Sequence, residues 1–329
     1  MATELIDLKI DFGFKLIFGR EGQEPVLAAF LNAILKPPAG KQIQSLTYMN
    51  TELTKEHAGD KKSSLDIRAV TEEKQHFNIE IQLKNEHNMA RRTLYYWSEM
   101  YSRQMQESMA YDELNPTITI NILNFNCLQE TEEFHSAFHL YEQKKKFLLT
   151  DALALHFIEM PKLRRKWRAR EVTPRQDKLV RWLLLLDGSE DEEIRQQLEV
   201  IAMEDAMLNR ALKDWEKASA DPKLRELYFD RRKVVLDELA AIRAAGLREQ
   251  KALEKGLTEG RVEGRVEGKA DAICQYLDAR FGAESKPIQE IVLTITELDT
   301  LTHIINHIFT VSDIDEVIKL VQNARDKGT

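Results

Sequence analysis

The segment 65–84, LDIRAVTEEKQHFNIEIQLK, contains the residues of this chain that are best suited to chemistry. The segment consists of two runs, 65–70 and 76–84, in which apolar residues alternate with polar ones. The apolar residues of each run share one face: Leu65, Ile67 and Ala69 in the first run, and Phe77, Ile79, Ile81 and Leu83 in the second. The opposite face carries Asp66, Arg68, Asn78, Glu80, Gln82 and Lys84. Because side chains alternate between the two faces of a strand, this pattern predicts two paired strands with one buried face, joined by the polar link 71–75.

Asp66 and Glu80 are the two residues that favour a metal site. A link centred on Glu73 places position 66 opposite position 80, where two carboxylates on one sheet face repel each other. A bound divalent cation removes this repulsion, because carboxylate oxygens are its preferred ligands. Gln82 follows on the same face, where it would contact substrate or the attacking water. The residues therefore suggest a metal-dependent hydrolase, and the alternative is a solvated sheet face without chemistry.

The elements around this hairpin predict an α/β core. Residues 1–36 look helical, because PVLAAFLNAILK repeats apolar residues at helical spacing between Pro25 and Pro37. The other predicted elements are a strand at 43–50, a long helix at 88–110, a strand at 117–125, and two strands near 134–141 and 152–160. On the long helix we expect the buried side to consist of Leu94, Trp97, Tyr101 and Met105.

Beyond Pro161 the pattern becomes helical. One helix is expected to end at Gly188, with Ser189 as the N-cap of the next. The basic run KLRRKWRAR at 162–170 is either a contact to a phosphate backbone or a solvated linker. We predict four regions: an α/β domain at 1–165, a helical region at 166–250, a glycine-periodic charged helix or linker at 251–271, and a small helical C-terminal element at 272–329.

The tract GLTEGRVEGRVEGKAD has glycine at every fourth position from Gly256 to Gly268. Residues four positions apart in the tract carry like charges, glutamate after glutamate and arginine after arginine. Ion pairs between glutamate and arginine within one helix are therefore not expected. Each glycine costs a helix roughly 1 kcal/mol relative to alanine. Two copies would approach closely over the glycines and pair their charges between chains. We therefore predict a helical element that forms a homo-oligomer, most simply a homodimer; the alternative is a flexible charged linker.

Composition excludes several classes of protein. The chain has 329 residues, enough for about two or three domains. Its net charge of −8 argues against a protein that coats DNA non-specifically, but it allows a nuclease with a local basic patch. Cys127 and Cys274 are the only cysteines, so a disulfide framework is excluded and a reducing cytoplasm is expected. We expect no signal peptide and no membrane contact, because no apolar run approaches the roughly 20 residues that span a bilayer.

Two further pairs of residues are candidates for the site. Asp11 and Lys15 are four residues apart and share a helix face, so they form either an ion pair with each other or part of the site. Arg91 and Arg92 begin the predicted helix after the second strand, where they would clamp a phosphate backbone or remain solvated.

The wider pattern resembles the recombination-promoting nuclease and transposase family, within the PD-(D/E)XK nuclease superfamily. The matching motifs are DFGFKLIFG (11–19), LDIRA around Asp66, FNIEIQ around Glu80, RRTLYYWSEMYSRQ (91–104) and PTITINILNF (116–125). Their order and spacing match through about residue 160, and the glycine-periodic tract before a short helical C-terminus is also similar.

The resemblance implies a restriction-endonuclease-like core of a helix, a mixed central sheet and a flanking helix. It also implies a DNA endonuclease that uses Mg²⁺ or Mn²⁺ and is linked to recombination, mobile elements or defence against foreign DNA. Asp66 and Glu80 match the metal-binding pair, and Asp11 matches the acidic residue of the N-terminal motif. The alternative is a nuclease fold with weak or no catalysis, acting as a DNA-binding or protein-interaction scaffold.

Gln82 stands where the superfamily name has its lysine. A lysine would offer a positive charge to the reacting phosphate, whereas glutamine offers only dipoles. Lys84 and Arg68 lie on the same predicted face, and either one is a candidate for a partial replacement that would contact DNA phosphate; the alternative is that both are ordinary surface residues.

Overall fold

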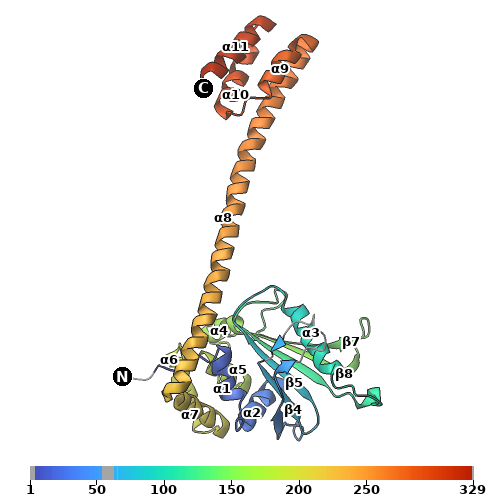
Figure 1. Cartoon of the computed structure of the whole chain (residues 1–329), viewed down its shortest axis with the longest axis vertical. Helices are drawn as coiled ribbons and strands as arrows, with labels where there is room; N and C mark the ends of the chain where they lie inside the picture. The colour runs from blue at the N-terminus through green and yellow to red at the C-terminus, as the bar shows by residue number, and fades with distance from the viewer. Residues whose placement is uncertain (1–3, 54–62, 65, 328–329) are drawn as a thin grey trace. The chain divides into compact units, whose positions relative to one another are not determined.

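The computed structural model describes residues 4–53, 63–64 and 66–327 (Figure 1). Leu65, one of the apolar residues of the predicted hairpin, therefore lies outside the described residues. The chain divides into two compact units, the first extending to Leu239 and the second beginning at Ala240.

A six-stranded mixed sheet forms the centre of the first unit. Its strands, in spatial order, are β1 (Leu46–Tyr48), β4 (Ile67–Thr71), β5 (His76–Gln82), β6 (Thr117–Leu123), β8 (Leu148–Glu159) and β7 (His135–Tyr141). Neighbouring strands are parallel from β5 through β6 to β8 and antiparallel elsewhere. A separate two-stranded sheet pairs β2 (Glu52–Leu53) with β3 (Ser63–Ser64). The predicted mixed α/β class is thus confirmed.

The register of the β4–β5 hairpin is the predicted one. Ile67 pairs with Ile79 and Ala69 with Phe77, so continuing the register by one residue sets Asp66 opposite Glu80. The polar face of the hairpin, however, is not solvated: Asn78 and Glu80 are each 1% exposed. The interpretation of that face as a solvated one was therefore wrong, because the sheet is covered by helices on both sides.

Different helices cover the two faces of the sheet (Figure 1). The apolar residues of β4, β5 and β6 join one hydrophobic core with residues of α1 (Asp11–Phe18), α2 (Glu24–Leu35) and α5 (Lys178–Asp187). The other face packs against α3 (Met89–Ser102), where Thr93 Oγ1 donates a hydrogen bond of 2.6 Å to Asn121 Oδ1 of β6. Glu80 pairs with Asn121 in the register, so it lies on the α3 side.

Two helix predictions need correction. The helical segment 1–36 is two helices, α1 and α2, separated by a turn that contains Gly22 at a φ of +88°. The helix predicted at 88–110 ends at Ser102, and its buried residues are Met89, Thr93, Tyr96 and Met100 rather than the predicted stripe of Leu94, Trp97, Tyr101 and Met105. The stripe is displaced because α3 covers a sheet face with polar residues, so Thr93 faces Asn121 and Leu94 points outward.

The helices after the sheet complete the first unit. They are α4 (Met160–Arg168), α5, α6 (Glu192–Ala202), α7 (Ala206–Ala220) and the first part of α8 (Pro222–Phe281), and a short 3-10 helix, η1 (Tyr111–Glu113), precedes β6. α5 is followed by Gly188 as expected, but the N-cap of α6 is Asp191, which accepts from Ile194 N at 3.2 Å, and not Ser189. The division at 165 stays a prediction, and helices on both sides of it share one core.

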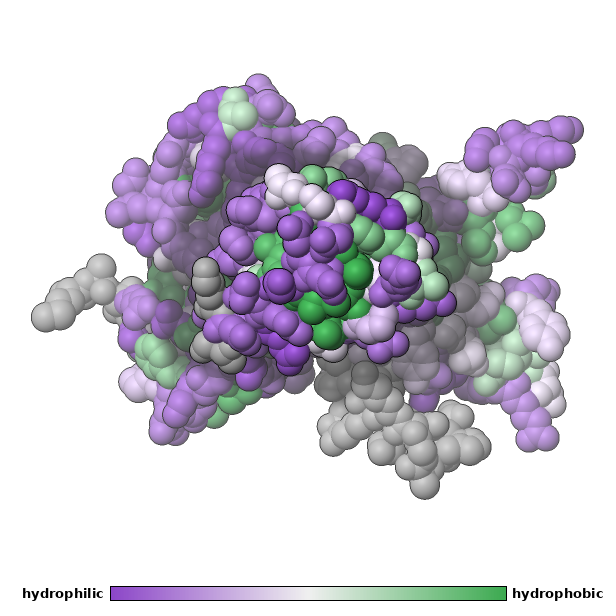
Figure 2. All heavy atoms as spheres, turned by 90° about the horizontal axis from the view of Figure 1, so that it is seen from above, coloured by the Kyte–Doolittle hydropathy of each residue, from purple (hydrophilic) through white to green (hydrophobic). Residues whose placement is uncertain are grey.

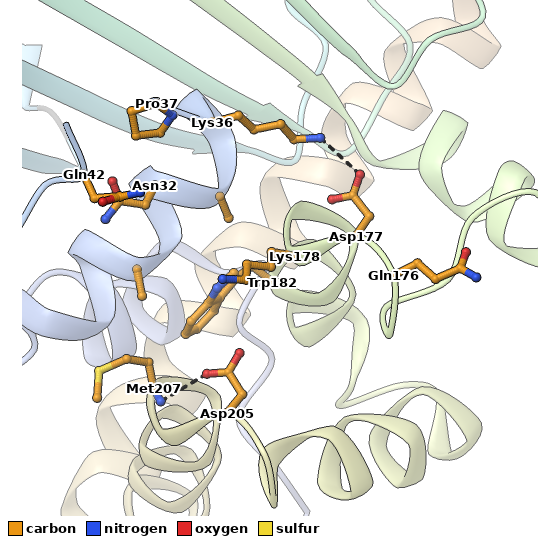
Figure 3. A pocket seen from close by; sticks show the side chains of 12 residues that line it. Asn32, Lys36, Pro37, Gln42, Gln176, Asp177, Lys178, Trp182, Asp205 and Met207 are labelled. Atoms are coloured by element: carbon orange, nitrogen blue, oxygen red, sulfur yellow. Dashed lines mark hydrogen bonds and ion pairs between the residues drawn. The ribbon is translucent and has the colours of Figure 1, made fainter. Parts of the chain in front are cut away.

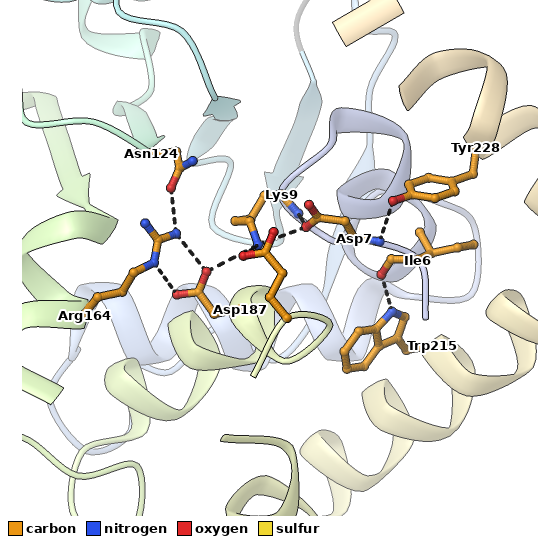
Figure 4. Close-up of polar contacts among 9 residues, drawn as sticks. Ile6, Asp7, Lys9, Asn124, Arg164, Asp187, Trp215 and Tyr228 are labelled. Carbon is orange, nitrogen blue, oxygen red and sulfur yellow. Dashed lines mark hydrogen bonds and ion pairs between the residues drawn. The ribbon is translucent and has the colours of Figure 1, made fainter. Parts of the chain in front are cut away.

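The N-terminal segment before α1 is fixed by side chains from α7 and α8. Ile6 O accepts a hydrogen bond of 2.7 Å from Trp215 Nε1, and Asp7 N donates to the Tyr228 hydroxyl at 3.1 Å (Figure 4). Lys9 Nζ then lies 3.2 Å from Asp7 and 3.5 Å from Asp187. These contacts determine where α1, which starts at Asp11, meets the sheet.

The basic run 162–170 lies mostly in α4, and its charges are largely paired within the unit. The paired residues are Lys162 with Glu159, Arg164 with Asp187, Arg165 with Glu132, Lys166 with Glu133 and Arg170 with Glu193. The run is therefore a helix with acidic neighbours and not a solvated linker.

The second unit is helical. Besides the last part of α8 it contains α9 (Lys286–Val292), α10 (Leu298–His307) and α11 (Ile314–Lys327), with short 3-10 turns η2 (Gly282–Ser285) and η3 (Ile308–Thr310). They enclose a core of their own, and Figure 2 shows apolar residues among hydrophilic ones on the face of this unit turned to the viewer. The glycine tract is part of α8, and a Cβ built on any of Gly256, Gly260, Gly264 and Gly268 would meet nothing within 4 Å. In the described part of the chain, no helix is long and apolar enough to cross a membrane.

Candidate active site

Asp66 and Glu80 come together at the start of β4 and near the end of β5. Asp66 Oδ2 accepts a hydrogen bond of 2.9 Å from Ile81 N, which ties the carboxylate of one strand to the backbone of the other. Burial raises the pKa of Glu80 to about 7; the charge of Arg92 opposes this shift and the charge of Asp66 adds to it. Burial also raises the pKa of Asp66. The two carboxylates thus lie opposite each other, as the sequence predicted, and Glu80 is buried, which the sequence did not predict.

Glu80 is buried with one oxygen unsatisfied. Its Oε1 receives a long hydrogen bond, 3.4 Å, from Asn78 Nδ2, and a hydrogen bond from the Gln82 side chain also acts to lower the pKa of Glu80. Its Oε2 accepts no hydrogen bond from the described residues. The nearest cation to that oxygen is Arg92 of α3, whose Nη2 lies 3.6 Å away. A buried acceptor without a donor is rare in proteins and leaves a lone pair for a ligand.

Asp66 is flanked by α1. Lys15 Nζ lies 3.6 Å from Asp66 Oδ1, and the negative charge of Asp11 is near enough to act on the pKa of Asp66, raising it. Asp11 itself receives two parallel hydrogen bonds from Arg231 of α8, each of 2.9 Å. Among the described residues Asp11 and Lys15 do not pair with each other, so the ion-pair alternative for these two residues is wrong.

The carboxylates fit a divalent cation of the Mg²⁺ type. Such an ion is commonly held by one or two protein carboxylates, with water and substrate phosphate as its other ligands. Asp66 and Glu80 supply that number, and Glu80 Oε2 offers an oxygen with no competing donor. In the described residues no group of three or more His, Cys, Asp and Glu side chains could hold a metal. The donor set therefore suits a hard cation shared with a phosphate.

The four residues predicted to contact DNA phosphate have different surroundings in the structure. Arg92 reaches Glu80, whereas the neighbouring Arg91 is exposed at the start of α3. Lys84 forms an ion pair with Glu238 of α8, and Arg68 donates a hydrogen bond of 2.8 Å to the carbonyl of Asn50. Lys84 and Arg68 therefore already have partners within the unit, which weakens the expectation that either one replaces a lysine at position 82.

Sequence reasoning missed Arg231 and Glu238. Both lie on α8, seven residues apart, and their partners Asp11 and Lys84 precede them by 220 and 154 residues. Neither residue belongs to a recognisable motif, so only the folded chain could reveal them.

A cavity of about 700 Å³ lies elsewhere in the first unit (Figure 3). Residues of α2 and α5 line it, among them Asn32, Trp182 and Lys36, whose Nζ pairs with Asp177 at 3.2 Å. None of the predicted site residues lines this cavity. The carboxylate pair is therefore a separate feature from this cavity.

One known protein family matches nearly all of the first unit. The family described as PD-(D/E)XK nuclease family transposase matches residues 8–245, more than half of the chain. The chain belongs to this family. The resemblance found in the sequence is thereby confirmed, and the match includes Asp11, the hairpin and Glu238. No curated protein and no solved structure gives a significant match.

Membership of the PD-(D/E)XK nuclease family transposases links the chain to nucleases and to mobile elements. Nucleases of this type act on DNA and typically use divalent metal ions. The acidic pair at the β4–β5 hairpin is the feature of this structure that has the corresponding donor chemistry.

Proposed function

We propose that the chain is a metal-dependent DNA endonuclease that hydrolyses phosphodiester bonds, in recombination, the movement of mobile elements or defence against foreign DNA. One observation carries the proposal: Asp66 and Glu80 are held together out of water, and Glu80 Oε2 lacks a hydrogen-bond donor. Burying like charges side by side destabilises a fold, and the cations Lys15 and Arg92 compensate them only from 3.6 Å. A site that binds a cation and a phosphate gives a reason for keeping them.

Each residue has a role in this proposal. Asp66 and Glu80 would hold Mg²⁺ or Mn²⁺, which when bound lowers the pKa of a water ligand and polarises a phosphoryl oxygen. Gln82 orients Glu80 and the attacking water, and Asp11, fixed by Arg231, supports Asp66. The water oxygen bonds to phosphorus as one phosphorus–oxygen ester bond breaks; water gives up one proton to solvent and the departing oxygen takes one. The products are a phosphomonoester end and a hydroxyl end.

The basic residues of α3 would hold the DNA. Arg91 is exposed, and Arg92, whose Nη2 lies 3.6 Å from Glu80 Oε2, has a side chain that is a quarter exposed. Guanidinium groups bind phosphate through paired N–H donors, so α3 can place the backbone over Glu80. Contacts to phosphate do not depend on the base sequence of the DNA. They are electrostatic, so the affinity for DNA should fall as the salt concentration rises.

The test is nicking of supercoiled plasmid by the purified chain in Mg²⁺, Mn²⁺ or EDTA. We expect metal-dependent nicking, reduced at least about 10³-fold in Asp66→Asn and in Glu80→Gln, because each variant removes a ligand charge and keeps the side-chain shape. Glu73→Gln is the matched control, since Glu73 is an exposed carboxylate in the turn of the same hairpin. Nicking that survives in both site variants would remove the proposal.

A second candidate function is a nuclease-fold protein that binds DNA or protein without cutting. It is favoured by the two contacts from α8, which engage Asp11 through Arg231 and Lys84 through Glu238. This function would be favoured if the well-folded wild-type chain binds a DNA duplex but does not nick plasmid with any of the metals tested.

We also propose that the tract 251–271 of α8 associates with a second copy. Its glycines face open space, so a side chain added there would leave the single chain undisturbed but would block a close helix–helix contact. Gly260→Leu with Gly264→Leu should lower the mass measured by light scattering to that of a monomer. Thr258→Leu, on the opposite side of the helix from Gly256 and Gly260, should leave the mass unchanged. A wild-type monomer at high concentration would contradict the proposal.

A further inference from the structure

We propose that Lys15 of α1 supplies the positive charge that Gln82 does not bring to the reacting phosphate. The inference rests on the endonuclease function proposed above and assigns one more catalytic residue to it. It starts from position: Lys15 Nζ lies 3.6 Å from Asp66 Oδ1, whereas Arg92 Nη2 lies 3.6 Å from the other carboxylate, at Glu80 Oε2.

Lys15 is held in place by the helix that carries it. Gly19, at the end of α1, approaches the sheet so closely that a Cβ there would lie 2.8 Å from Cγ1 of Ile67, the residue after Asp66. Near the start of the helix, a Cβ on Gly13 would collide with the Asp7 carbonyl. The buried side chains of Phe14 and Phe18 fix the rotation of the helix. The backbone of Lys15 is therefore positioned against Asp66 by close packing on both sides.

Three of the other nearby cations are more fully engaged, and the fourth, Arg92, lies beside the other carboxylate, 3.6 Å from Glu80 Oε2. Arg231 makes two hydrogen bonds of 2.9 Å to Asp11, Lys84 pairs with Glu238, and Arg68 bonds to a backbone carbonyl. Lys15 meets Asp66 only at 3.6 Å, and its side chain is 37% exposed. A lysine at this distance can turn its ammonium group from the carboxylate to an incoming phosphate oxygen without giving up a short hydrogen bond.

The chemistry needs a cation at this point. Negative charge builds up on the non-bridging phosphate oxygens as water attacks, and a fixed positive group beside them lowers the barrier. The side chain of Gln82 is neutral and hydrogen-bonds to Glu80. The competing explanation is that Lys15 only neutralises Asp66, in which case removing it would leave nicking unchanged or increase it by freeing the ligand.

Four variants separate these explanations in the plasmid assay. Lys15→Met should reduce metal-dependent nicking by about 10²-fold or more, and Lys15→Arg should retain most of it. Gln82→Lys added to Lys15→Met should restore nicking at least about tenfold, because it replaces the lost ammonium group with another one next to the carboxylate pair. Lys36→Met removes a lysine that pairs with Asp177 beside the separate cavity, and it should nick like wild type.

Binding of Mn²⁺ to the chain without DNA, followed by electron paramagnetic resonance, provides the second readout. Lys15→Met should bind Mn²⁺ at least as tightly as wild type, since a cation 3.6 Å from a ligand oxygen repels the ion. Weaker Mn²⁺ binding would mean that Lys15 merely shapes Asp66 and would overturn the inference. If Lys15→Met nicks like wild type while Asp66→Asn is inactive, the role of Lys15 is overturned and the endonuclease function stands. If the wild-type chain is inactive, both the endonuclease function and the role of Lys15 are overturned.

Discussion

Glu80 and Glu159 are two buried glutamates of the same sheet whose surroundings differ. Glu80 on β5 is 1% exposed and Glu159 on β8 is 0% exposed, and each has a basic neighbour, Arg92 or Lys162. Burial and charge alone would make both of them candidates for a functional site. What separates them is how their oxygens are satisfied.

Every oxygen of Glu159 has a close donor. Its Oε1 accepts from the backbone N–H groups of Cys127 at 2.6 Å and Leu128 at 3.1 Å, and its Oε2 accepts from Lys162 Nζ at 2.6 Å. Glu80 has instead a 3.4 Å bond on Oε1, no hydrogen bond from the described residues on Oε2, and a second carboxylate beside it. Glu159 has the contacts of a structural residue, while Glu80 keeps an oxygen without a hydrogen-bond donor among the described residues, as the proposed metal ligand requires.

The network around Lys9 supports the same distinction. Lys9 is buried with Asp7 and Asp187, and Arg164 donates to both oxygens of Asp187 at 2.8 Å (Figure 4). Both oxygens of Asp187 therefore have a short hydrogen bond from a cation, although Lys9 Nζ itself makes no hydrogen bond with the described residues. A buried acid is thus weak evidence for function, and an unsatisfied oxygen next to a like charge is much stronger evidence.

The difference between Glu80 and Glu159 should have its largest effect on stability. Glu159→Gln should lower the free energy of unfolding by about 3–5 kcal/mol, because it leaves the buried Lys162 without a counter-charge. Glu80→Gln should not lower it at pH 8 in EDTA. Urea unfolding followed by tryptophan fluorescence reports on the first unit, since Trp97, Trp167, Trp182 and Trp215 all lie in it. Equal losses in the two variants would show that Glu80 is structural as well.

The sequence alone predicted the acidic pair but not its surroundings. Alternation and the short link determine the register, so Asp66 and Glu80 could be placed opposite each other. Their burial depends on α3, whose covering face includes Thr93 and could not be recognised from apolar spacing. The partners of the pair come from distant elements, such as Arg231, which lies 220 residues from Asp11. Local patterns contain no information about such contacts, which arise only when α1, α3 and α8 pack around the sheet.

The next effect is the pH dependence that Glu80 gives the metal-free chain. A carboxyl group with a raised pKa holds its proton more tightly in the folded state, so its contribution to stability is full below the unfolded pKa of 4.5 and is lost as the pH rises through about 7. Between pH 5 and pH 8, wild type should therefore lose roughly 2–3 kcal/mol relative to Glu80→Gln. Urea unfolding at the two pH values in EDTA measures this difference. Parallel pH profiles for wild type and Glu80→Gln would mean that the buried carboxylate is better compensated than its contacts indicate.

The smallest effect is stabilisation by the metal, and it tests the comparison most directly. A ligand that binds only the folded chain raises stability by RT ln(1 + [L]/Kd), which is about 1.4 kcal/mol for Mg²⁺ at ten times its dissociation constant. We expect this increment in wild type and its loss in Glu80→Gln, measured as the shift of the tryptophan-monitored unfolding midpoint between Mg²⁺ and EDTA. Glu159→Gln, although less stable, should keep the increment, because its carboxylate is fully used by Cys127, Leu128 and Lys162. The opposite result, an increment that depends on Glu159 and not on Glu80, would place the cation at β8 and reverse the roles of the two glutamates.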